Sequence, residues 1–261
     1  MKHVRLVGLC LVAMCGCAVV AVPSASATAP EYGRCLKAEK VGKEYKGKFS
    51  KSSCTVEVPP AERSKKGKYE WYPGAVKLGQ TSSGGKGVLE EVGKYAVGCS
   101  SESSTGEYTG TKEGKNLVVK FKNCISGPLT CTSEGYEKGE LVTKPLAGRL
   151  VWENEKTGKT AIDLFPEKGE LFIEFNCEGK LSVAVKGSVL VPVKANKMAE
   201  TFTLKFKAKH GFQTPEYYEE GGKKVKDVLL SDFAGKGYEQ AGQTITSTVK
   251  NEEKLEINTV V

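Results

Sequence analysis

The stretch "KLSVAVKGSVLVPV", residues 180–193, decides the fold class. Six of its large apolar residues fall on one parity: Leu181, Val183, Val185, Val189, Val191 and Val193. Side chains of a β-strand alternate between two faces, so this period of two predicts a long strand that lies over a core. Gly187 interrupts the pattern, and we expect a bend or bulge there.

A second stretch, "TFTLKFKAK" at 201–209, repeats the alternation. Phe202, Leu204 and Phe206 are predicted to face inward, while Lys205, Lys207 and Lys209 face outward. The outward lysines are typical of an edge strand protected from pairing with another molecule, and an anionic wall polymer is the alternative partner for them.

Further strand candidates are joined by short, turn-like connectors such as "EKTGK", "NCEGK" and "NEEK". Short connectors make neighbouring strands antiparallel. Few helical signals occur, the best being one or two turns at 193–200. We therefore predict an all-β fold: an antiparallel β-sandwich or barrel of about ten or more strands, stapled by disulfides.

The first 27 residues have the layout of a secretory signal peptide. Lys2 and Arg5 precede an apolar run, and small residues end at Ala27, where we expect cleavage. Residues 28–261 are then a single secreted β domain, extracellular and without a transmembrane segment. Within it, residues 28–94 are less regular and are predicted to form an N-terminal lobe.

Removal of residues 1–27 lowers the net charge from +8 to +6, with both signs interspersed along the chain. This mild excess argues against a nucleic-acid partner. The same cleavage leaves an even number of cysteines, as expected in an oxidising compartment. They are Cys35, Cys54, Cys99, Cys124, Cys131 and Cys177.

The spacing of these cysteines indicates disulfides rather than a metal or redox site. There is no CxxC, and His210 is the only histidine after residue 27. Six cysteines allow 15 pairings. Our preferred set is Cys35 with Cys54, Cys124 with Cys131 around a Gly-Pro turn, and Cys99 with Cys177.

No catalytic, metal or cofactor motif is found. His210 reads as an exposed loop residue, and Glu174 faces away from the apolar residues of its strand. Only three aspartates occur, without a calcium-loop pattern. "SSGGKG" lacks the spacing of a phosphate-binding loop. These absences favour a protein that is not an enzyme and holds no cofactor or metal.

Aromatic residues supply the candidate binding site. "YEWYPG" places Trp71 and Tyr72 beside a Pro-Gly turn, and "GFQTPEYY" places Tyr217 and Tyr218 in another predicted connector. Flat rings on loops can stack against sugar faces. The competing interpretation is that these rings anchor their loops to the core.

Several stretches resemble a family of uncharacterised secreted proteins of soil actinobacteria. They are "EYGRC" (31–35), "YEWYPG" (69–74), "CSSESSTGEYTGTK" (99–112), "GELVTKPLAG" (139–148), "GSVLVPVKANKM" (187–198) and "NEEKLEINTVV" (251–261). The resemblance spans nearly the whole chain after residue 27. It implies secretion from a Gram-positive bacterium, and it carries over no activity, ligand or site residue.

We interpret the chain as a secreted, non-catalytic binding or surface-interaction protein, with a cell-wall or environmental polysaccharide as its ligand class. Two alternatives stay open: a secreted glycosidase-like hydrolase that uses glutamates, and a structural envelope component. Fold class alone does not decide among them, and the sequence leaves the oligomeric state open.

Overall fold

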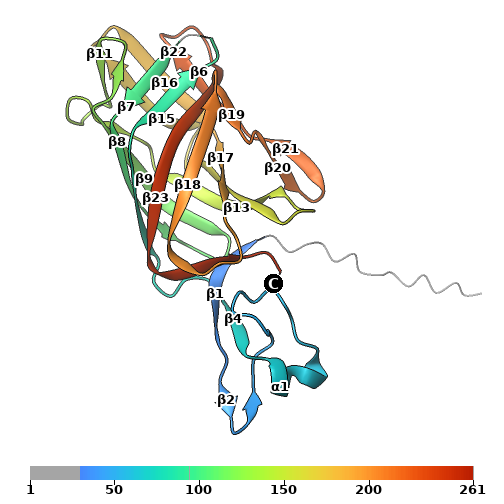
Figure 1. The fold of residues 1–261 in the computed structure, drawn as a ribbon. Coiled ribbons are helices and arrows are strands. Elements are labelled where there is room, and N and C mark those ends of the chain that lie inside the picture. The colour runs from blue at the N-terminus through green and yellow to red at the C-terminus, as the bar shows by residue number, and fades with distance from the viewer. Residues whose placement is uncertain (1–29, 94, 261) are drawn as a thin grey trace, which may run out of the picture.

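The computed structural model describes residues 30–93 and 95–260, and the predicted signal peptide lies outside them. The fold is almost entirely antiparallel β, as predicted, and it is a barrel rather than a sandwich (Figure 1). The barrel wall has two connected parts, a closed ring of strands and a curved sheet below it. A small lobe lies below the curved sheet.

Eight strands close into a complete ring through successive antiparallel ladders. In order round the ring they are β6 (Gly87–Glu91), β7 (Ala96–Cys99), β10 (Ile125–Ser126), β11 (Leu129–Thr132), β15 (Leu171–Cys177), β16 (Leu181–Gly187), β22 (Leu229–Phe233) and the start of β23 (Glu239–Asn258), which pairs with β6 again. We call this the closed ring. Such closure leaves no free sheet edge.

A second set of strands continues the wall below the ring and is called the curved sheet. Its ladders run from β18 (Ala199–Lys209) through the rest of β23, β5 (Gly79–Gly84), β8 (Ser101–Tyr108), β9 (Glu113–Lys122), β13 (Leu146–Asn154) and β14 (Lys159–Pro166) to β17 (Val189–Val193). Since β17 lies beside β18, the sheet curls round almost to closure. β12 (Leu141–Val142) pairs with β9, and β19 (Phe212–Thr214) pairs with β18.

The alternation seen in the sequence is confirmed. Leu204 and Phe206 are buried, whereas Lys205, Lys207 and Lys209 are exposed. The stretch at 180–193 divides at Gly187 into β16 in the ring and β17 in the curved sheet. Gly187 has φ +95°, and a Cβ there would lie 2.3 Å from the Val228 carbonyl oxygen, which explains the glycine at this bend.

The helix expected at 193–200 does not form, because β17 runs to Val193 and β18 starts at Ala199. Short helical turns occur instead in the N-terminal lobe: η1 (Pro60–Glu62) and α1 (Arg63–Lys66). Pro60 at the first helical position suits this start, since its ring fixes a helical φ.

The N-terminal lobe comprises β1 (Glu31–Lys37), β2 (Lys40–Val41), β3 (Glu44–Tyr45), the two helical turns and β4 (Tyr69–Pro73). β1 joins the lobe to the curved sheet because it pairs with β4 and with the end of β23. The lobe is shorter than the predicted range of 28–94, since β5 and β6 are part of the barrel wall.

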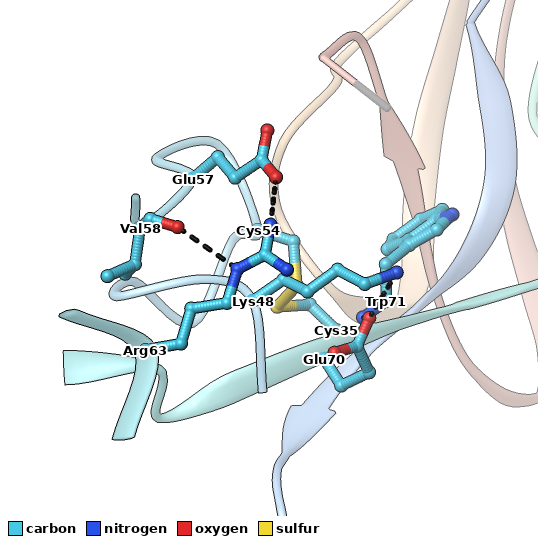
Figure 2. A network of polar contacts seen from close by, with 8 residues as sticks. All are labelled: Cys35, Lys48, Cys54, Glu57, Val58, Arg63, Glu70 and Trp71. Carbon is cyan, nitrogen blue, oxygen red and sulfur yellow. Dashed lines mark hydrogen bonds and ion pairs between the residues drawn. A yellow bond between two sulfur atoms is a disulfide. The ribbon is translucent and has the colours of Figure 1, made fainter. Parts of the chain in front are cut away.

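Cys35 and Cys54 are joined at the centre of the lobe, as predicted (Figure 2). Arg63 closes the loop after Cys54 by donating to Glu57 Oε1 at 2.7 Å and to the Val58 carbonyl at 3.2 Å.

The other two predicted pairs are wrong, since the bonds join Cys99 to Cys124 and Cys131 to Cys177. The strand register puts the four cysteines in one row across β7, β10, β11 and β15. Cys99 and Cys177 are at the ends of that row, three strand spacings or about 14 Å apart. A disulfide spans Cα atoms up to about 7 Å apart, so only neighbours can pair.

Candidate ligand-binding site

A cavity of about 140 Å³ lies inside the barrel and spans the closed ring and the curved sheet. Phe175 and Val185 of the closed ring line it, as do Leu204 and Val249 of the curved sheet. These side chains follow from the inward parity of their strands. An eight-stranded barrel is wide enough to hold one small ligand, and a cavity of about 150 Å³ lined by apolar side chains can take up benzene.

One wall of the cavity is polar, and three adjacent strands supply it. β5 contributes Ser82, β8 contributes Glu102 and Ser104, and β23 contributes Ser247. Ser82 pairs with Ser104 across the β5–β8 ladder, and Gly84 pairs with both Glu102 and Ser247. All therefore face the same side of the sheet, toward the interior.

These polar groups form one hydrogen-bonded cluster. The Ser82 hydroxyl donates to Glu102 Oε1 at 2.6 Å, and the Ser247 hydroxyl donates to Oε2 at 2.7 Å. Ser104 shares a hydrogen bond of 2.7 Å with Ser82. The carboxyl of Glu102 is thus fixed on the cavity wall, and we call these four residues the Glu102 cluster.

Two tyrosines also line the cavity. Tyr32 of β1 and Tyr108 of β8 meet edge to face, with ring centroids 4.8 Å apart. The Tyr108 hydroxyl donates to Asn251 Oδ1 at 2.7 Å. Burial raises the pKa of both phenols, so they are neutral, rigid parts of the wall.

A different buried carboxyl lies in the closed ring. Glu91 accepts from the Ser231 hydroxyl at 3.2 Å, and its pKa is raised mainly by burial. It is not among the residues that line the cavity. Along the described chain, Glu102 is the only carboxyl in that lining.

Asp163 and Asp227 form an acidic pair on the outside of the barrel. The pair lies under the hairpin of β20 (Tyr217–Glu220) and β21 (Lys223–Lys226). Arg149 Nε donates to Asp163 Oδ2 at 2.8 Å, and Arg149 Nη2 donates to the Tyr218 hydroxyl at 2.6 Å. Burial, together with the nearby Asp163 carboxylate, raises the pKa of Asp227 to about 8. Through these two hydrogen bonds, Arg149 holds the hairpin against the barrel.

The four aromatic residues predicted as a sugar platform are not brought together. Trp71 and Tyr72 lie on β4 in the lobe, and Tyr217 and Tyr218 lie on β20. Both pairs are in strands rather than in the predicted loops. Tyr218 is buried under its hairpin and bonded to Arg149, so its face cannot stack on a sugar.

Trp71 is half-buried and packs in the lobe core beside Cys35 and Cys54 (Figure 2). A Cβ at Gly33 would lie 2.4 Å from Trp71 Cζ2, so this glycine makes room for the ring. Trp71 therefore anchors β4 to the core of the lobe. Tyr72 and Tyr217, each 44% exposed, remain accessible.

The remaining candidates lie at the surface. His210 is exposed in the turn between β18 and β19, and Glu174 is exposed with Lys144 Nζ 4.0 Å away. In residues 30–93 and 95–260, no group of three or more His, Cys, Asp or Glu side chains could hold a metal ion. No helix in those ranges is long and apolar enough to cross a membrane.

The Glu102 cluster was missed because "GQTSSG" and "SESSTGEY" have polar or small residues on both parities. Without an apolar contrast, the sequence does not show which side faces inward. The run of small residues was the one available signal, since small side chains leave space inside a barrel.

No family model, curated protein or solved structure matches this sequence.

Proposed function

We propose that this chain is a secreted binding protein that holds one small, largely apolar molecule inside its barrel. The observation that supports this proposal most strongly is the cavity of about 140 Å³, whose lining is mainly apolar and includes the polar Glu102 cluster. Preformed apolar cavities with a few convergent polar groups are typical of small-molecule sites. Three buried disulfides support the secreted part of the proposal, because such bonds persist in oxidising compartments.

This proposal changes the ligand class expected from the sequence. A polysaccharide needs exposed rings on one face, and Trp71 and Tyr218 do not offer them. A glutamate-based glycosidase needs two carboxyl groups flanking the scissile bond. Among the described residues that line the cavity, Glu102 stands alone, which favours binding over hydrolysis.

Toluene is the simplest probe of the cavity, because a single ring matches its volume. We expect saturable binding of toluene to the folded protein, measured by saturation-transfer NMR. Leu204→Trp fills the cavity and should weaken binding at least about tenfold, or about 1.4 kcal/mol. Lys205→Trp places the same side chain on the outer face of β18 and should leave binding unchanged.

Val119→Met adds a smaller volume to the cavity wall and serves if Leu204→Trp does not fold. Circular dichroism establishes that each variant keeps its β structure. If neither toluene nor any other single-ring probe binds the folded parent protein, the proposed function is wrong. Equal loss in Leu204→Trp and Lys205→Trp would also contradict a site inside the barrel.

A further inference from the structure

Glu102 is the only charged side chain among the described residues of the cavity lining. It is 6% exposed, and it projects from β8 into a space otherwise bounded by apolar side chains and neutral polar groups. Burial of an ionised carboxyl costs several kcal/mol unless a cation or several hydrogen bonds compensate it.

The protein supplies only neutral partners for this carboxyl. Ser82 and Ser247 each donate one hydroxyl hydrogen to it. The ion pairs formed among residues 30–93 and 95–260 do not include Glu102. No lysine, arginine or histidine lines the cavity in this part of the chain.

The carboxylate also has unused acceptor capacity. An ionised carboxylate offers about four lone-pair sites, and the two serine hydroxyls use two of them. Since Glu102 itself lines the cavity, a group inside the cavity can reach the remaining sites. A ligand that donates hydrogen bonds and carries positive charge satisfies both requirements together.

We propose that the barrel selects a compact amine, with the ligand's ammonium group on Glu102 and its apolar body against the apolar side chains of the lining. Leu204 and Ile162 of the curved sheet are among those side chains. The size of the cavity limits the ligand to about one ring or a short chain. This inference rests on the proposed function, since it names the ligand class of the same site.

Four probes of nearly equal size separate the contributions: benzylamine, benzyl alcohol, toluene and benzoate, each titrated at pH 7. Hydrogen bonds to charged groups contribute about 1.5–3 kcal/mol. We therefore expect benzylamine to bind at least about tenfold more tightly than toluene. Benzyl alcohol should lie between them, and benzoate should be excluded by like charge.

Glu102→Gln tests the residue directly. It should weaken benzylamine binding at least about tenfold and leave toluene binding within about twofold, since the shape is kept while the charge is lost. Glu113→Gln is the matched control because Glu113 is exposed at the start of the neighbouring strand β9. It should change neither affinity.

The outcomes distinguish the two proposals. Binding of toluene without preference for benzylamine would overturn the amine selection and leave the binding function in place. Failure of all four probes to bind would overturn the binding function itself. The ranking of probes in the parent protein needs no variant, so it decides the question even if Glu102→Gln does not fold.

Discussion

Gly84 faces Glu102 across the β5–β8 ladder, and a Cβ at Gly84 would lie 2.7 Å from Glu102 Oε2. The same atom would lie 2.9 Å from the Thr246 carbonyl oxygen. The buried carboxyl therefore occupies space that only a glycine on the facing strand leaves free. The two residues form one feature of the cavity wall.

Gly84→Ala should displace the Glu102 carboxyl and press on the β23 backbone. Overpacking of this kind typically costs about 1–3 kcal/mol, so we expect a lower melting temperature and weaker benzylamine binding. The adjacent Gly85 has open space where a Cβ would be. Gly85→Ala is therefore the control, and equal effects of the two substitutions would contradict this packing.

The raised pKa of Asp227 predicts a pH dependence of stability. With a folded-state pKa of about 8 against an ordinary value of 3.8, the folded protein holds this proton more tightly than the unfolded chain does. Its contribution to stability is present below about pH 4 and is lost as pH rises toward about 8. For this one proton, the free energy of unfolding changes by at most about 1.4 kcal/mol per pH unit.

Asp227→Asn removes this titration. Relative to the parent protein, we expect the variant to gain stability progressively between pH 5 and pH 9 in thermal melts. Asp232→Asn, at a partly exposed site on β22, should show no such trend. A difference between Asp227→Asn and the parent that does not vary with pH would show that Asp227 titrates normally.

Trp71→Ala tests the role of this ring in the lobe. Full burial of a tryptophan contributes about 3–5 kcal/mol, and we expect about 2 kcal/mol for this half-buried ring, with faster hydrogen exchange across β1 and β4. Tyr72→Ala, at the next and more exposed position, should change stability little. Similar losses at both positions would argue against packing of Trp71 on Gly33.

The disulfides predict both a fragment pattern and an order of stability. Mass spectrometry of the unreduced, digested protein should find Cys99 bonded to Cys124 and Cys131 bonded to Cys177. By the chain-entropy estimate, replacing Cys131 and Cys177 with alanine should cost about 4 kcal/mol, and replacing Cys35 and Cys54 about 3 kcal/mol. A fragment joining Cys124 to Cys131 would contradict this pairing, and one joining Cys99 to Cys177 would contradict the strand register.

The sequence was sufficient for the fold class because the decisive strands carry apolar contrast. Leu204 and Lys205 differ so strongly that the inward side of β18 is evident, and the valines of 181–193 act in the same way. The disulfide pairing was not predictable from spacing. It depends on the strand order that places Cys124 next to Cys99, and this order is a tertiary property.

The candidate site was also hidden for a physical reason. Glu102 and Ser103 are both polar, so neither neighbour shows that Glu102 points into the barrel. Conversely, Trp71 is of a residue type common in binding sites, but its ring is partly buried in the space that Gly33 leaves on the neighbouring strand. Both interpretations depend on contacts between segments far apart in the chain.

A crystal structure of the protein soaked with benzylamine tests the central claim most directly. We expect density for one ring inside the barrel beside Leu204, with the ligand nitrogen within about 3.2 Å of a Glu102 carboxylate oxygen. Ordered water alone in the cavity at saturating benzylamine, or the ligand bound only at the outer surface, would contradict the account.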